Sequence, residues 1–298
     1  MANASKCELW FAGRPMGNER DDENGFLRMT AAGWNFAGST APSHRGLKPP
    51  SKLLWLAEYR AFWEIGFALA ASPLLMTAPR GDGHPVLVLP GFLVSDISTS
   101  LLRRFLTALG YETYGWELGR NLGGVTKMRG KLRDRLRSIH EKTGKKATVV
   151  GWSLGGVYAR DLALAMPDAV RSVITLGSPF SRNPNASNIS DVYEFVSGEG
   201  PWDNGDQIAH ELDALSGDLP MPSTSIWSKI DGVVSWKSSV LKTNARTENI
   251  EVIGASHIGL GGNAAVLWAV ADRLAQPENA FTPFARTGPF AIAYGAGR

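Results

Sequence analysis

A serine near the middle of the chain has the surroundings that best suit nucleophilic chemistry. It lies in the pentapeptide Gly-Trp-Ser-Leu-Gly at residues 151–155, between a short apolar run and a helix-compatible segment that reaches about Met166. Strand, sharp turn and helix are therefore predicted in that order, with the hydroxyl of Ser153 exposed at the turn. The flanking glycines lack a Cβ, which lets the strand and the helix pass close together. An ordinary glycine-rich turn is the alternative interpretation.

A serine hydroxyl is a poor nucleophile unless a neighbouring base accepts its proton. Two histidines follow Ser153: His210 lies in a polar stretch, whereas His257 lies in a glycine-flanked loop directly after a predicted strand. We predict that His257 is the base and that Asp231, which also follows a strand, holds the imidazole in the required tautomer. A simple turn residue is the alternative for Asp231. The competing acids are Asp203, Asp206, Asp213 and Glu251.

Two backbone N–H groups are predicted to stabilise the oxyanion that forms when a carbonyl is attacked. One belongs to Leu154, at the start of the helix, where the helix dipole favours negative charge. The other belongs to Phe92, because a glycine just before it permits a turn that aims the next N–H into the site. The neighbouring apolar residues Leu93, Trp152 and Ile258 predict an apolar acyl group in the substrate.

The elements that must position these residues alternate between strand and helix. Apolar runs bounded by glycine or proline predict strands, and segments with helical spacing predict helices. Strands are predicted at 86–89, 111–118, 147–150, 170–176, 222–228 and 250–253, and helices at 98–109, within 120–146, at 154–166 and at 263–274. This order predicts an α/β fold with a mostly parallel sheet. A polar stretch at about 181–221 predicts a cap or lid insertion.

Five segments together resemble the α/β-hydrolase family, and within it the lipase and carboxylesterase branch. They are Pro90-Gly91-Phe92, Gly151-Trp152-Ser153-Leu154-Gly155-Gly156, Leu176-Gly177-Ser178-Pro179, Asp231-Gly232-Val233-Val234 and Ser256-His257. The resemblance spans about residues 84–275. Larger members of the family begin with two antiparallel strands, for which residues 1–80 show no clear counterpart.

The resemblance implies a serine hydrolase that cleaves carboxylic esters through an acyl-enzyme, with Ser153, His257 and Asp231 as its catalytic triad. It implies a small-molecule or lipid ester as substrate and no cofactor. Because one fold supports several reactions, an acyltransferase or amidase with the same triad is an alternative, and so is a non-catalytic hydrolase-fold protein that docks on membranes.

The composition limits these hypotheses. The 298 residues are 44% hydrophobic and 20% charged, with a net charge of +3, which suits one large α/β domain. The single cysteine, Cys7, excludes an internal disulfide, and the five histidines show no paired ligand spacing, so no metal is predicted. Nothing in the sequence predicts an oligomeric state.

The predicted domain organisation is an N-terminal extension, residues 1–80, followed by a catalytic domain, residues 81–298. Residues 1–46 are polar and lack the basic and apolar regions of a secretory signal. A cytoplasmic protein is therefore expected, and peripheral association with a membrane is compatible with that location.

An apolar, aromatic helix is predicted within this extension at 52–75, with Ser51 as its N-cap. Its charged residues Glu58, Arg60 and Glu64 argue against a membrane span, which needs about 20 predominantly apolar residues. A helix packed against the body is expected. The alternative is an interfacial helix that makes peripheral contact with a membrane.

Positive charge is concentrated between Arg120 and Lys146, where ten Lys and Arg residues stand against Asp134 and Glu141. Apolar residues at helical spacing within this segment predict a helix with one packed face and one basic face. A solvated surface is expected, and a patch for an anionic membrane or for nucleic acid is the alternative. Since aromatic interleaving and nucleic-acid motifs are absent from the sequence, no nucleic-acid partner is predicted.

Overall fold

The computed structural model describes residues 48–180, 214–278 and 280–296, which fall in one compact unit, Ala41–Arg298. Its centre is a sheet with the strand order β2-β1-β3-β4-β5-β6, in which all neighbouring strands are parallel. The strands are β1 (Pro85–Leu89), β2 (Glu112–Gly115), β3 (Ala147–Trp152), β4 (Val170–Leu176), β5 (Ser223–Trp227) and β6 (Thr247–Glu251). The predicted parallel sheet is confirmed.

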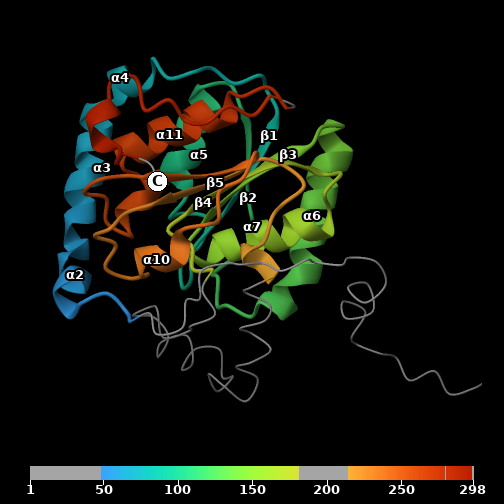
Figure 1. Ribbon diagram of the computed structural model, residues 1–298. Helices are drawn as coiled ribbons and strands as arrows, with labels where there is room; N and C mark the ends of the chain where they lie inside the picture. The colour runs from blue at the N-terminus through green and yellow to red at the C-terminus, as the bar shows by residue number, and fades with distance from the viewer. Residues whose placement is uncertain (1–47, 181–213, 279, 297–298) are drawn as a thin grey trace, which may run out of the picture. The chain divides into compact units, whose positions relative to one another are not determined.

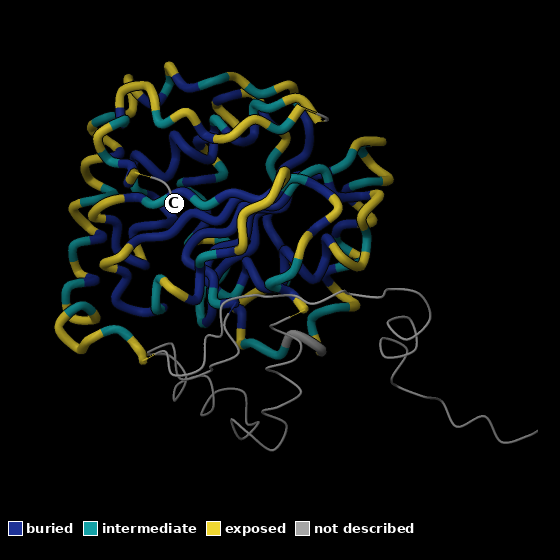
Figure 2. The backbone as a smooth tube through the Cα atoms, in the orientation of Figure 1, coloured by how far each residue is buried: buried dark blue, intermediate teal, exposed yellow. Residues whose placement is uncertain are grey.

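Helices cover both faces of this sheet, as Figure 1 shows. On one face lie α5 (Ser100–Ala108) and α11 (Ala264–Leu274), and on the other lie α6 (Val125–Thr143) and α7 (Leu154–Ala165). A strand buried on both faces needs apolar residues on both, which explains why β1, β3 and β5 are buried along their whole length. Figure 2 shows the sheet as a dark blue band between the two helical layers.

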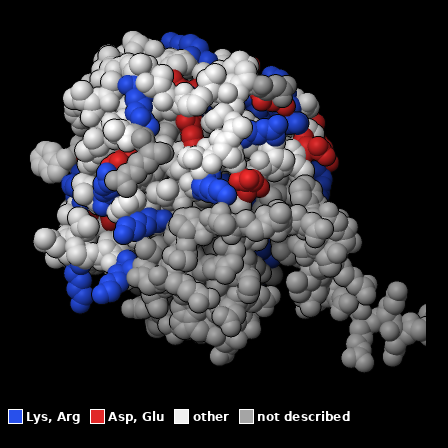
Figure 3. Space-filling model, in the orientation of Figure 1, with Lys and Arg blue, Asp and Glu red and all other residues white. Residues whose placement is uncertain are grey.

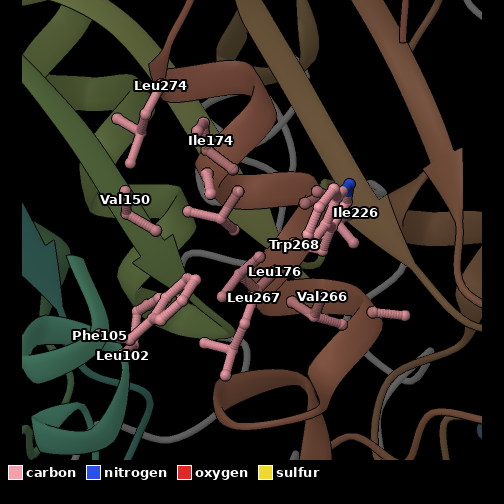
Figure 4. Close-up of a cluster of buried hydrophobic side chains, with 14 of the residues drawn as sticks. Leu102, Phe105, Val150, Ile174, Leu176, Ile226, Val266, Leu267, Trp268 and Leu274 are labelled. Carbon is pink, nitrogen blue, oxygen red and sulfur yellow. The ribbon is translucent and has the colours of Figure 1, made fainter. Parts of the chain in front are cut away.

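Successive strand residues point to opposite faces, so the sheet separates two apolar cores. Val86 and Val88 of β1 join the core beneath α5 and α11, whereas Leu87 and Leu89 join the core beneath α6 and α7. Figure 4 shows part of the first core, where side chains of α5 and α11 meet those of the strands. The residues labelled there are Leu102, Phe105, Val150, Ile174, Leu176, Ile226, Val266, Leu267, Trp268 and Leu274.

Two strands end at least two residues earlier than predicted. β2 ends at Gly115 rather than 118, because the next two N–H groups bond to the carboxylate of Asp96 at 3.0 and 2.9 Å instead of to a strand. β6 ends at Glu251 rather than 253, because Val252 forms an isolated antiparallel bridge with Tyr294 near the C-terminus. Both strand ends therefore depend on residues distant in sequence, Asp96 for β2 and Tyr294 for β6, which no local pattern predicts.

The predicted helix at 52–75 is divided into four pieces along one end of the sheet. They are α2 (Lys52–Leu56), the 3₁₀ helix η1 (Ala57–Arg60), α3 (Ala61–Ala70) and α4 (Ser72–Leu75). Ser51 caps α2 as predicted, since its hydroxyl accepts a hydrogen bond from the Leu54 N–H at 3.3 Å. α3 packs beside α11 and the 3₁₀ helix η3 (Gly259–Gly261).

These N-terminal helices have an inverted pattern of burial. Glu58 is buried and the side chains of Arg60 and Glu64 are largely covered, whereas most of the large apolar side chains point to solvent. The outward-facing apolar residues, which we call the aromatic face, are Leu53, Trp55, Leu56, Tyr59, Phe62, Trp63, Phe67 and Leu69. The expected helix therefore packs against the body, but through its charged residues. None of the helices in the described ranges is long and apolar enough to cross a membrane.

The basic segment forms α6 as predicted, with Leu132, Leu136 and Ile139 in the second core. Several of its cations have acidic partners. These pairs are Arg129–Asp161, Arg135–Glu117, Arg137–Asp134, Lys142–Glu112 and Lys146–Glu278. On the face shown in Figure 3, basic and acidic side chains are likewise interspersed. The local ion pairs therefore offset part of the positive charge that the sequence concentrates here.

Candidate active site

Ser153 lies between β3 and α7 in a strained backbone conformation, with φ of 53° and ψ of −121°. Positive φ is costly for a residue with a Cβ, and it occurs where the surrounding structure enforces it. The neighbouring glycines show how it is enforced: a Cβ on Gly151 would lie 2.3 Å from the Gly155 carbonyl oxygen, and one on Gly155 would lie 2.3 Å from that of Leu89. The predicted close passage of strand and helix is thus observed.

The loop after β1 lies directly against this turn. A Cβ on Gly91 would be 3.3 Å from the Cβ of Ser153. The loop is fixed by Asn121, which is fully buried. Its side-chain Nδ2 donates to the Pro90 carbonyl at 2.9 Å, and its backbone carbonyl accepts a hydrogen bond from the Leu93 N–H at 2.7 Å. No pattern in the sequence predicts this role for Asn121.

His257 and Asp231 form a buried hydrogen-bonded pair. Nδ1 of His257 lies 2.7 Å from Oδ2 of Asp231, and both side chains are almost fully enclosed. The other carboxylate oxygen, Oδ1, accepts the N–H groups of Val233 and Val234 at 2.8 and 2.7 Å. A carboxylate held by three donors keeps a fixed orientation, so it also fixes the imidazole ring.

Two opposing effects act on the pKa of His257. Burial lowers it, because the charged imidazolium loses its water. The negative charge of Asp231, the hydrogen bond to it and the charge of Glu58 raise it, and together they leave the pKa of His257 above its ordinary value. The site therefore stabilises the imidazolium that forms when the neutral ring accepts a proton.

The loop that carries His257 adjoins the turn of Ser153. The indole Nε1 of Trp152 donates to the His257 carbonyl at 3.1 Å, and the two rings have centroids 6.3 Å apart. Ser153 N–H bonds to the Leu176 carbonyl, and a Cβ on the next residue, Gly177, would lie 3.2 Å from His257 Nδ1. Within the described ranges, no hydrogen bond joins the Ser153 hydroxyl to the His257 ring.

The residues predicted to contact an acyl group have different environments. Trp152 is buried and joins the first core, so its indole mainly supports the His257 loop. Leu93 is half-buried with a positive φ of 64°, and Ile258 is exposed. Leu154 is half-buried at the first position of α7, where a helix leaves N–H groups without intrahelical acceptors.

Of the competing residues, only Glu251 lies within the described ranges. His210, Asp203, Asp206 and Asp213 lie outside the described residues, as does most of the predicted 181–221 insertion. Glu251 pairs with Lys229 at 2.8 Å. Within the described ranges, no group of three or more His, Cys, Asp or Glu residues could hold a metal ion.

Two cavities of about 410 Å³ each lie at the amino ends of the strands, and both include Arg171 and Lys146 in their walls. Ser153 and His257 line neither of them. The candidate site, in contrast, lies at the carboxyl ends of the strands, where the loops after β1, β3, β5 and β6 meet.

Sequence reasoning missed Glu58, Arg60 and Glu64, whose side chains hold the loops after β5 and β6. A signal was present: three charged residues stand in an otherwise apolar, aromatic segment. Charges that become buried must be paired or hydrogen-bonded, so such a cluster predicts partners elsewhere in the fold. Which loops supply those partners is visible only in three dimensions.

No known sequence family matches this chain, and no curated protein sequence matches it. Among solved structures, lipase B of Aspergillus fumigatus superposes with a TM-score of 0.51 at 16% identity, over 67% of this chain and 54% of that chain. A structure reported for the metagenome-derived lipolytic enzymes LipS and LipT gives a TM-score of 0.50 at 15% identity, over 66% of this chain and 93% of that chain. This chain thus matches about half of the Aspergillus lipase. The likeness establishes the α/β-hydrolase fold, and the predicted fold class is confirmed.

Proposed function

We propose that this protein is a serine hydrolase that cleaves carboxylic esters through an acyl-enzyme. The observation that carries the proposal is the buried His257–Asp231 pair, held at the same edge of the sheet as the strained turn of Ser153. The similarity of the fold to lipolytic enzymes supports it. Fold alone does not fix a reaction, so the proposal rests on the site.

In the first step, Ser153 Oγ attacks the ester carbonyl while Nε2 of His257 accepts the hydroxyl proton. Asp231 holds Nδ1–H and stabilises the imidazolium that forms. The imidazolium then protonates the leaving alcohol, and the C–O bond to that alcohol breaks to leave an acyl-serine. Water, deprotonated by His257, attacks the acyl-serine, and the acid is released as Ser153 regains its proton.

The tetrahedral intermediate carries a negative oxygen that needs fixed donors. We assign this task to the backbone N–H groups of Leu154 and Phe92. Leu154 is the first residue of α7, and Phe92 follows Gly91, which lies against Ser153. The apolar neighbours Leu93 and Ile258 are assigned to the acyl chain of a small-molecule or lipid ester. No cofactor or metal takes part in this scheme.

The test is loss of function at Ser153. Ser153→Ala should abolish hydrolysis of p-nitrophenyl acyl esters, with a loss of about 10⁴-fold or more. It should also abolish labelling by a fluorophosphonate. Ser138→Ala, at an exposed serine of α6, is the matched control and should leave both unchanged. Full activity in Ser153→Ala would refute the assignment of the nucleophile.

An acyltransferase or amidase could use the same residues. Product analysis with an added alcohol acceptor separates the first, since a transferase forms the new ester in preference to the free acid. Anilide substrates test the second. A panel of esters with increasing chain length then defines the acyl preference.

We further propose that the aromatic face binds a lipid surface that holds the substrate. Trp and Tyr are suited to the boundary between lipid and water, and the exposed Lys48 and Lys52 adjoin this face. Replacing Trp55, Phe62 and Trp63 together with Ser should abolish co-sedimentation with vesicles of phosphatidylcholine and phosphatidylglycerol. Replacing Ile97 and Ile292, two exposed apolar residues outside this face, with Ser is the matched control. Equal binding by both variants would refute the lipid contact.

A further inference from the structure

A single buried carboxylate joins the loops that carry the proposed acid and base. Glu58 lies in η1 and is buried. Its carboxylate accepts hydrogen bonds from the backbone N–H groups of Gly232, His257 and Ile258, at 2.8, 3.0 and 2.9 Å. Gly232 directly follows Asp231. One side chain therefore links the acid loop to the base loop, and it does so through the backbone of the base itself.

The other two charged residues of these helices bind the same loops. The guanidinium of Arg60 donates to the carbonyls of Ile230 and Ala255, which precede Asp231 and His257 in their loops. The carboxylate of Glu64 accepts the Ser256 N–H at 2.9 Å and the Asn263 side-chain amide at 2.9 Å. Both loops are thus held by a set of charged groups that lies outside the predicted catalytic domain.

Two glycines let the helices approach this closely. A Cβ on Gly232 would lie 2.3 Å from the carbonyl oxygen of Leu54 and 2.9 Å from Oε1 of Glu58. A Cβ on Gly259 would lie 2.2 Å from Oε2 of Glu64. At these positions the loop backbone touches the helices directly, so a shift of the helices would be transmitted to the loops.

We propose that Glu58 is a positioning residue: it fixes the separation of the loops that carry Asp231 and His257 and places a second negative charge beside the imidazole. This inference rests on the proposed function, because it gives the N-terminal helices a role in the chemistry of that site. A displacement of about 1 Å in such a group is enough to slow catalysis about 100-fold. Charge-assisted hydrogen bonds to three backbone donors suit a carboxylate for this role.

Among the described residues, three charged groups lie around His257. Asp231 is bonded to Nδ1, Glu58 is bonded to the backbone N–H, and Arg60 lies 3.9 Å from the Glu58 carboxylate. Burial and Asp231 have the larger effects on the pKa of His257, and the charge of Glu58 adds to the rise. Loss of that charge should therefore lower the pKa of His257.

The test compares Glu58→Gln with Glu58→Asp. Glutamine keeps the size but loses the charge, so kcat should fall about 10-fold to 100-fold with little change in KM. The acid limb of the pH–rate profile should also move to lower pH. Aspartate keeps the charge on a shorter side chain, so the acid limb should stay in place while kcat falls. Glu117→Gln, at an exposed residue paired with Arg135, is the control and should change neither.

A second measurement does not depend on turnover. NMR titration of the His257 ring, in protein that carries Ser153→Ala, should give a lower pKa when Glu58→Gln is added. If Ser153→Ala retained esterase activity, the proposed function would fail, and the NMR shift would still report on Glu58. If Glu58→Gln lowered the melting temperature but left kcat, the acid limb and the ring titration unchanged, Glu58 would serve stability alone and the inference would be overturned.

Discussion

The described part of the chain includes two histidine–aspartate pairs, at opposite ends of the same sheet. At the carboxyl ends, His257 Nδ1 lies 2.7 Å from Asp231, and at the amino ends, His84 Nδ1 lies 2.5 Å from Asp82. Both imidazoles are buried. The two pairs are nearly equivalent in residue type and distance, yet their surroundings shift the pKa values of the two histidines in opposite directions.

The second nitrogen of His84 is already occupied. Its Nε2 lies 3.0 Å from the Thr148 hydroxyl, and its ring packs edge-on against Tyr111 with centroids 5.0 Å apart. Within the described ranges, no such hydrogen bond ends at Nε2 of His257. An imidazole can transfer a proton only if one nitrogen is bound by its orienting partner and the other faces the reactant.

The charges around the two rings also differ. Burial lowers the pKa of His84, and Arg171 and Lys145 lower it further, so that it lies below its ordinary value despite the hydrogen bond to Asp82. The side chain of Asp82 is 54% exposed and is shared with Arg171, whereas that of Asp231 is buried and Glu58 adds a second negative charge. Pairing with an aspartate therefore does not by itself raise the pKa of a histidine; at His257 the enclosed negative charges of Asp231 and Glu58 raise it.

The largest expected difference between the pairs follows from removing each carboxylate charge. Asp231→Asn should lower kcat for ester hydrolysis by about 10⁴-fold, because the amide orients the imidazole in the wrong tautomer. Asp82→Asn should change kcat less than about threefold, a bound that follows from its distance from the reaction. Steady-state kinetics on purified variants checks both. Equal losses would show that the comparison is wrong.

The second-largest difference in kcat is expected when a methyl group is added beside each pair. Gly177 and Gly83 both have positive φ, at 56° and 76°, so alanine strains the backbone at either position. Only at Gly177 would the new Cβ crowd the pair, 3.0 Å from Asp231 Oδ2 and 3.2 Å from His257 Nδ1. Gly177→Ala should therefore lose about 100-fold in kcat, and Gly83→Ala should keep it near wild type. Melting temperatures serve as the control for the shared strain.

The pH dependence of the reaction should report one histidine only. Because the pKa of His257 is raised, the acid limb of kcat/KM should lie above the ordinary histidine pKa of about 6.5. Below that limb the rate should fall about tenfold for each pH unit, since only neutral imidazole accepts the proton. His84→Gln should leave the limb in place, and a shifted limb in that variant would contradict the assignment.

The smallest effect concerns stability against pH, and its sign differs between the pairs. His257, with a raised pKa, contributes stability that is present below about pH 6.5 and is lost as pH rises through its folded pKa. His84, with a lowered pKa, contributes stability that is present above about pH 6.5 and is lost as pH falls. Denaturant unfolding of His84→Gln and His257→Gln from pH 5 to 8 should therefore give difference slopes of opposite sign relative to wild type. Slopes of the same sign would refute the contrast.

Local patterns carried much of this protein's organisation. Apolar runs bounded by prolines and glycines predicted the parallel sheet, and the glycines around Ser153 predicted a tight turn, since these properties depend on neighbours in the chain. The pairing of His257 with Asp231 was also predicted, because loops after parallel strands meet at one edge. The limits of β2 and β6 were not, since Asp96 and Tyr294 are distant in sequence from the ends they fix.

The sheet, the turn and the order of serine, aspartate and histidine follow from local patterns in the chain. That the aromatic face turns outward and Glu58 turns inward to meet His257 and Gly232 depends on the three-dimensional fold. The physical reason is that a buried carboxylate is stable only where several N–H groups converge on it. Those groups come from residues more than 170 positions away, and folding alone brings them together.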